Sequence, residues 1–122
     1  MLVKTKAIVL VHCLGFNAMN EEIIKIAKDN EILIIEDCCE ALGATYKGKK
    51  VGSFGSMGCF SFFANKIITT GEGGMCLTND LRLKEQLDHL RSMAFDPQHT
   101  FLHKKIGYNF RMTNMQAAIG LA

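Results

Sequence analysis

Two short runs of aliphatic residues, Ala7–Val11 and Ile32–Ile35, restrict the fold more than any other part of the sequence. Neither run alternates apolar with polar residues, which is typical of strands that are buried on both faces of a parallel sheet. A helix is predicted between them, because Asn20 is a suitable N-cap and Glu21 and Glu22 favour a first helical turn. Strand, helix and strand within about thirty residues predict a βαβ unit, and therefore an α/β protein.

The rest of the chain predicts further short elements. The stretch Cys38–Gly43 is expected to form a short helix or a turn. The last helix is apolar and has no C-cap, so we expect the chain to be a segment of a longer protein. The remaining predicted elements are a hairpin around Gly48 with the arms Ala44–Tyr46 and Lys49–Val51, strands over Cys59–Phe63 and Met75–Thr78, a helix over Leu81–Arg91 capped by Asn79 or Asp80, and a final helix over Met115–Ala122 capped by Thr113.

The composition narrows the class of protein. A chain of 122 residues, 48% of them hydrophobic, has the length and composition of one globular domain. Its formal net charge of +2 is too small to indicate a nucleic acid or a membrane surface as partner, and no apolar stretch is long enough to span a bilayer. Five cysteines without a Cys-x-x-Cys pair predict free thiols in a cytoplasmic protein and no metal site.

Charged side chains follow two of the predicted strands. In open parallel sheets, ligands bind beyond the carboxyl ends of the strands, where Glu36 and Asp37 follow one strand and Lys66 follows another. A carboxylate and an amine in one crevice suit pyridoxal phosphate, because a lysine attaches this cofactor and an aspartate pairs with its pyridine nitrogen. Ser61 and the amides of Gly71–Gly74 are candidates for binding the phosphate. The alternative is that Lys66 is a surface lysine in a turn.

Three other features have simpler interpretations. The stretch Gly43–Lys50 has the spacing of a P-loop, but Lys50 replaces the Ser or Thr that binds magnesium, so a surface hairpin is favoured over nucleotide binding. His12 either faces the site or is a buried histidine with satisfied hydrogen bonds. Cys38 and Cys39 are expected to pack rather than to catalyse.

Several segments of the sequence together carry a resemblance to a known family. They are Val11-His12 with Gly15, Ile35–Ala44, Tyr46–Gly55, Phe60–Met75 and Gly107–Ala122. In these segments the chain resembles the DegT/DnrJ-type sugar aminotransferases, which are fold-type I pyridoxal phosphate enzymes, and most of all their perosamine synthase branch. The resemblance covers nearly the whole chain, and its most specific motif is Phe60–Met75.

The resemblance implies roles for five residues. Lys66 is the Schiff-base lysine and the acid/base that moves protons between cofactor and substrate, and Asp37 pairs with the pyridine nitrogen. Glu40 lies near the cofactor ring or its hydroxyl, and Ser61 binds the phosphate. Asn109 reaches the phosphate of the neighbouring subunit's cofactor, so a homodimer is expected for the full-length family.

The implied reaction moves an amino group from L-glutamate to a nucleotide-linked 4-keto-6-deoxy sugar, such as GDP-4-keto-6-deoxymannose, in the biosynthesis of polysaccharide sugars. Phe63 favours the perosamine branch, because several other branches have His there, and Lys66 argues against the relatives that carry His in its place and act as dehydratases. Residues 1–122 are expected to form part of the large domain, without the N-terminal segment and the small C-terminal domain of the family. The alternative is a truncated, inactive remnant with at most a structural role.

Overall fold

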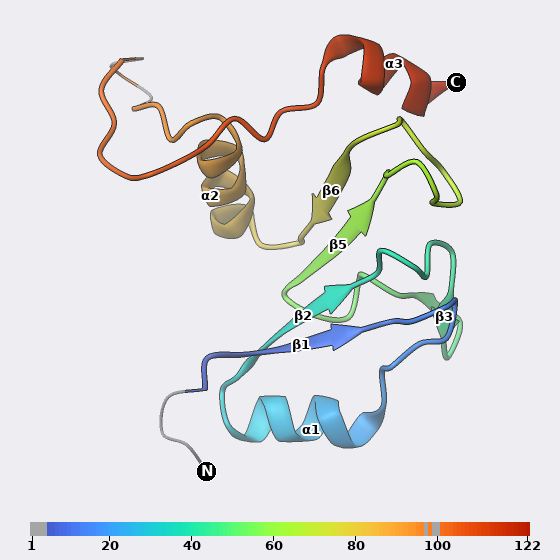
Figure 1. The fold of residues 1–122 in the computed structure, drawn as a ribbon. Coiled ribbons are helices and arrows are strands. Elements are labelled where there is room, and N and C mark those ends of the chain that lie inside the picture. Colours follow the sequence, from blue (N-terminus) through green and yellow to red (C-terminus); the bar gives the residue numbers. More distant parts are fainter. Residues whose placement is uncertain (1–4, 97, 99–100) are drawn as a thin grey trace.

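The computed structural model describes residues 5–96, 98 and 101–122, which form a four-stranded sheet with three helices around it (Figure 1). The strands lie in the order β1 (Ala7–Val11), β2 (Leu33–Asp37), β5 (Met57–Ser61) and β6 (Gly74–Leu77). The first three are parallel, and β6 runs antiparallel to β5. This mostly parallel sheet confirms the predicted α/β class.

The helix α1 (Glu21–Asp29) connects β1 to β2 and packs on one face of the sheet, as the sequence predicts. Asn20 caps it, and its side chain accepts a hydrogen bond of 2.8 Å from the main-chain nitrogen of Ile23. A cap of this kind stabilises a helix by about 1 kcal/mol. The buried core between helix and sheet consists of Leu10, Met19, Ala27 and Ile34.

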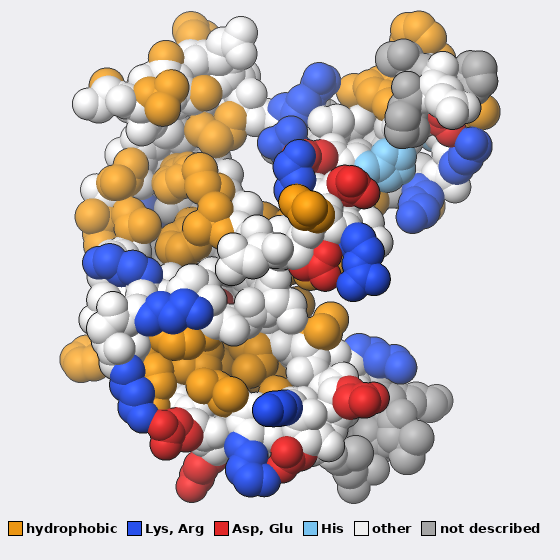
Figure 2. All heavy atoms as spheres, turned by 180° about the vertical axis from the view of Figure 1, so that it is seen from behind, with side chains coloured by type: hydrophobic (Ala, Val, Ile, Leu, Met, Phe, Trp, Pro, Cys, Tyr) orange, Lys and Arg blue, Asp and Glu red, His pale blue; other side chains and the backbone are white. Residues whose placement is uncertain are grey.

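The opposite face of the sheet is open in the described part of the chain. Successive side chains of a strand point to opposite faces, so Leu10 faces α1 while Val9 and Val11 point away. These two valines are 58% and 54% exposed. The prediction that β1 is buried on both faces is therefore wrong for the described residues, because no helix among them supplies the second layer. Hydrophobic side chains also gather over the part of the molecule that carries the β5–β6 hairpin and the C-terminal helix (Figure 2).

The remaining elements largely follow the sequence prediction. β5 begins two residues earlier than predicted, and Cys38–Gly43 forms turns and no helix. No helix within the described ranges is long and apolar enough to cross a bilayer. The other elements are the hairpin β3 (Thr45–Tyr46) and β4 (Lys49–Lys50), the helix α2 (Leu81–Arg91) capped by Asp80, and the helix α3 (Asn114–Leu121), which Thr113 and Gln116 cap reciprocally.

The loop before β5 passes so close to β2 that a side chain at Gly55 has no room. A Cβ there would lie 2.4 Å from the carbonyl oxygen of Ile34. We expect Gly55→Ala to lower the free energy of unfolding by about 1–3 kcal/mol, as overpacking does, in a urea titration. Gly43→Ala is the control, because Gly43 has a positive φ of 87° but open space around it. Gly43→Ala therefore measures the backbone strain of a positive φ without a clash, and a Gly55→Ala variant that is as stable as the wild type would contradict the close approach.

Candidate functional site

Lys66 lies in the loop that connects β5 to β6, at the carboxyl end of β5. Main-chain hydrogen bonds hold this loop in shape: Phe62 donates to Gly73 over 2.8 Å, and Thr70 donates to Phe62 over 3.0 Å. A further bond of 3.0 Å, from the nitrogen of Lys66 to the carbonyl of Phe63, forms the turn that carries the lysine. Main-chain bonds therefore define the turn that carries Lys66, and its role as a site residue stays a prediction.

A cavity of about 280 Å³ lies beside this loop. Three of the predicted site residues, Lys66, Ser61 and Glu40, line it together. Its volume is at the lower end of the roughly 300–1,000 Å³ found for small-molecule sites. The other residues that line it are Leu14, Cys39, Leu42, Asn65, Ile67 and Ile68.

Asp37 stands at the end of β2, on the face of the sheet opposite α1, in register with Cys59 of β5. Its Oδ1 accepts a hydrogen bond of 3.0 Å from the main-chain nitrogen of Cys39. Hydrogen bonds from Cys39 lower the pKa of the Asp37 carboxyl, and the nearby positive charge of Lys66 lowers it further. Asp37 is therefore an ionised carboxylate close to the Lys66 amine.

Ser61 and Glu40 are held by the segments around them. The Ser61 Oγ accepts a bond of 3.2 Å from the nitrogen of Phe63, so its own O–H is available to donate to a ligand. The Glu40 Oε2 accepts a bond of 3.3 Å from the nitrogen of Leu14 and lies 3.4 Å from the Cys13 Sγ. Glu40 thereby fixes the loop after β1, which supplies Leu14 to the cavity wall.

Asn109 does not line this cavity. It forms an antiparallel bridge with Ser92, and its Oδ1 accepts bonds of 3.2 Å from the main-chain nitrogen and the Nε of Arg111. The expectation that Asn109 serves the cofactor of a neighbouring subunit stays a prediction.

The glycines of Gly71–Gly74 do not line the cavity, and the Gly71 N–H donates to the Thr69 hydroxyl over 2.9 Å. Their role in binding the phosphate stays a prediction. Leu14 and Asn65 were missed, although Leu14 follows a buried strand and Asn65 precedes Lys66, and both positions lie at the strand ends where ligands bind.

Glu36 is buried in the protein and does not line the cavity beside Lys66, although the sequence predicts it at the ligand-binding edge of the sheet. The side chains of Glu36 and His12 are both fully buried and meet at 3.1 Å, so His12 is the satisfied buried histidine of the two predicted alternatives. Cys38 lies close to both, and the three side chains could form a metal site by their spacing. Both nitrogens of His12 are already engaged, one by Glu36 and one by the nitrogen of Ala18, so no lone pair is left for a metal ion.

The cysteines next to Asp37 are not activated nucleophiles. Burial raises the pKa of Cys38 to about 12, and it raises that of Cys39 to about 11. Both remain thiols at neutral pH, in agreement with their predicted role in packing.

The lysines of the Gly43–Lys50 stretch have partners within the protein. Lys47 pairs with Glu21, Lys49 donates to the carbonyl of Ser53 over 2.8 Å, and Lys50 donates to the carbonyl of Gly43 over 2.8 Å. The stretch is the predicted hairpin, and its three amines already have partners within the protein, which disfavours a phosphate site.

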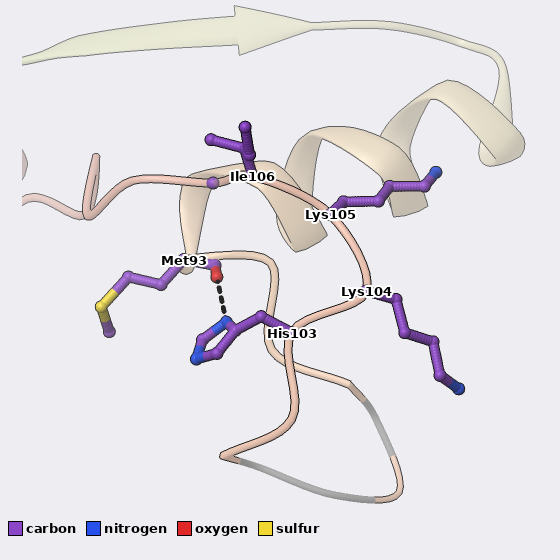
Figure 3. A pocket seen from close by; sticks show the side chains of 6 residues that line it. Met93, His103, Lys104, Lys105 and Ile106 are labelled. Carbon is purple, nitrogen blue, oxygen red and sulfur yellow. Dashed lines mark hydrogen bonds between the residues drawn. The ribbon is translucent and has the colours of Figure 1, made fainter.

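A larger, open cavity of about 580 Å³ lies between the end of α2 and residues 103–107 (Figure 3). The His103 Nδ1 is bonded to the carbonyl of Met93 over 2.8 Å, and Lys104 and Lys105 extend away from each other. Lys104 pairs with Asp96 over 2.6 Å. Among the described residues around this cavity, no carboxylate converges with an amine other than the paired Lys104, so the smaller cavity beside Lys66 is the better candidate.

Comparison with known proteins places these residues in a family. Residues 2–122 match the model of the DegT/DnrJ/EryC1/StrS aminotransferase family. The chain is 51% identical over 119 residues to the GDP-perosamine synthase of Escherichia coli O157:H7, covering 98% of this chain and 33% of that protein. The chain therefore spans about a third of the length of the curated relatives it matches.

Solved structures agree with this assignment. The Helicobacter pylori aminotransferase PseC, involved in the biosynthesis of pseudaminic acid, superposes with a TM-score of 0.89 at 40% identity, over 98% of this chain and 33% of that one. A GDP-4-keto-6-deoxymannose-3-dehydratase with a trapped PLP-glutamate geminal diamine superposes with a TM-score of 0.89 at 36% identity, over 99% of this chain and 36% of that one. The chain belongs to the DegT/DnrJ/EryC1/StrS aminotransferase family.

Proposed function

We propose that the protein holds pyridoxal phosphate beside Lys66 and forms the central part of an aminotransferase. This enzyme would move an amino group from L-glutamate to a nucleotide-linked 4-keto-6-deoxy sugar. The observation that carries the proposal is the convergence of Lys66, Ser61 and Glu40 on one cavity, with the ionised Asp37 beside the lysine.

The residues of the cavity fit the cofactor. Among the described residues, Lys66 makes no ion pair, so its amine can attach the cofactor and move a proton. The Asp37 carboxylate matches a protonated pyridine nitrogen, and the Ser61 O–H matches a phosphate oxygen. When bound, the cofactor supplies an electron sink for bonds at the amino carbon. The protein's contribution is to orient that carbon, to hold the proton at Lys66 and to keep Asp37 ionised.

The substrate class follows from the relatives and from two residues. The relative that is 51% identical is a GDP-perosamine synthase, and a structural relative at 36% identity holds a PLP-glutamate adduct. Lys66 supports amino transfer over dehydration, and Phe63 supports the perosamine branch, as the sequence resemblance implies. GDP-4-keto-6-deoxymannose is therefore the acceptor that we propose.

Two further features belong to the same proposal. Asn109 lies away from the cavity of its own chain, which supports a homodimer in which it reaches the partner's site. All five cysteines are free, which supports a reducing compartment such as the cytoplasm.

The test is the absorption spectrum of the protein mixed with pyridoxal phosphate. We expect a visible band of the bound cofactor, which L-glutamate converts to the shorter-wavelength band of the amino form, and which GDP-4-keto-6-deoxymannose then restores. Because the chain spans a third of its relatives, the same titration is made with a chimera in which residues 1–122 replace the matching third of the Escherichia coli GDP-perosamine synthase.

The two proteins separate the possible outcomes. A band in the chimera alone would mean that these residues form a working site that needs the remainder of the enzyme. No band in either protein would contradict cofactor binding and leave the inactive remnant as the explanation. A band that L-glutamate does not shift would contradict amino transfer.

A further inference from the structure

The fully buried carboxylate of Glu36 accepts four hydrogen bonds, although it lines neither of the two cavities described above. Its Oε1 accepts bonds of 2.7 Å from the main-chain nitrogens of Phe54 and Gly55. Its Oε2 accepts a bond of 2.7 Å from the nitrogen of Gly52 and lies 3.1 Å from the His12 Nε2. The loop before β5 is thus an anion-binding nest whose anion is a side chain of the neighbouring strand.

The bonds of His12 determine the charge of this pair. The His12 Nδ1 accepts a bond of 2.9 Å from the main-chain nitrogen of Ala18, so its proton is on Nε2. The Nε2–H then donates to Glu36. The ring thus offers Glu36 a donor and no acceptor, so a proton on the carboxyl would have no partner there. The pair is therefore a neutral histidine bonded to an ionised carboxylate, and all four donors around Glu36 face an anion.

The same hydrogen bonds hold the backbone at Asp37. The side chains of Glu36 and Asp37 point to opposite faces of β2, toward α1 and toward the open face. The main-chain nitrogen of His12 donates to the Asp37 carbonyl over 2.9 Å, while the ring of the same residue holds Glu36. The end of β1, the end of β2 and the loop before β5 are thus joined through one carboxylate. These bonds connect Glu36 to the peptide that carries Asp37.

We propose that Glu36, together with His12, is the positioning residue for Asp37: it fixes the strand end so that the Asp37 carboxylate is held toward Lys66 and the cofactor cavity. This inference rests on the proposed function of Asp37. Glu36 itself touches neither cofactor nor substrate and acts only through the peptide bonds that it orders.

Glu36→Gln is the test, because it keeps the shape and replaces one acceptor oxygen, which receives two of the four bonds, by an NH₂ donor. Whichever way the new amide is turned, its NH₂ group faces two donors, either those of Phe54 and Gly55 or those of Gly52 and His12. Ile24→Ala is the matched control, since it weakens the packing of α1 on the same core and leaves every hydrogen bond of Glu36 in place. Both variants are compared at a temperature at which both are folded.

Two readouts distinguish positioning from a loss of stability. In the cofactor-free protein, Glu36→Gln should shift the NMR signals of the Asp37 carboxyl carbon and of the Cys39 amide, and Ile24→Ala should leave them in place. The second readout is cofactor affinity, measured in the protein or chimera that binds pyridoxal phosphate. Glu36→Gln should weaken binding by about tenfold or more, which is the effect of mutating residues that hold metal ligands in place. Ile24→Ala should weaken it by less than about twofold.

Each outcome bears on a different claim. Unperturbed Asp37 and Cys39 signals, or equal binding losses in the two variants, would overturn the positioning role even if wild-type protein binds the cofactor. A wild-type protein and chimera that bind no cofactor would overturn the proposed function, while the NMR comparison would still decide whether Glu36 holds Asp37. If Glu36→Gln does not fold, Glu36→Asp retains the charge one methylene farther back. It is expected to shift the same two signals, and unshifted signals would equally overturn the proposal.

Discussion

Lys66→Ala is expected to remove the visible band of bound pyridoxal phosphate and to reduce amino transfer by about 10³-fold or more. The substitution deletes the amine that attaches the cofactor and that carries the proton during transfer, and general acid–base groups alone contribute about 10²–10⁴-fold. The loop around Lys66 is held by main-chain bonds, so the fold should survive the loss of the side chain. The absorption spectrum and the rate of L-glutamate conversion, measured in the protein or the chimera, check both expectations.

Two matched variants make this result specific. Lys66→Arg keeps a positive charge beside Asp37 but offers no amine that can attach the cofactor, so it should lose the band as fully as Lys66→Ala. Lys28→Ala removes an exposed lysine from α1 and should leave the spectrum unchanged. A band that persists in both Lys66 variants would show that another lysine attaches the cofactor.

Asp37→Asn is expected to slow amino transfer by about 10²-fold, the scale of losing one preorganised electrostatic partner. Asparagine has nearly the same shape, but it cannot stabilise a positive charge on the pyridine nitrogen. Cofactor affinity should fall less than the rate, because the Lys66 attachment and the Ser61 contact remain. Steady-state kinetics together with a cofactor titration separate the two effects, with Asp29→Asn on the surface of α1 as the control.

The lowered pKa of Asp37 also determines a pH dependence. An aspartate whose folded pKa lies below its unfolded value contributes stability above the unfolded value, and this contribution is lost as the pH falls through the folded value. The usual pKa of aspartate is about 3.9, so the contribution of Asp37 should be constant at neutral pH and disappear only below about pH 4. The measurement is the free energy of unfolding of the wild type and of Asp37→Asn by urea titration at several pH values. A difference between the two proteins that changes between pH 5 and 7 would contradict an ionised Asp37.

The local elements were predictable because their signals are local. The aliphatic run Ala7–Val11 forms β1 with the predicted bounds, and Asn20 and Thr113 cap the helices that they were expected to cap. Lys66 and Asp37 were placed in one site because parallel strands present their carboxyl ends at one edge of a sheet, and the structure places the charge of Lys66 near Asp37. The bounds of β5 were shifted by two residues, since Gly58 has low strand propensity and enters the strand only because it packs against Gly52.

The sequence by itself determined the α/β class, the order of the elements, the family, and Lys66 and Asp37 as the candidate pair. The family resemblance singled out Asp37, but only the tertiary structure shows what its neighbour Glu36 does. Pleating sends Asp37 to the open face beside Lys66 and Glu36 to the α1 face, where backbone donors from the loop before β5 surround it. That loop is distant in the sequence and contributes only peptide N–H groups, which every residue except proline has. The pattern of side chains therefore carries no signal for the role of Glu36.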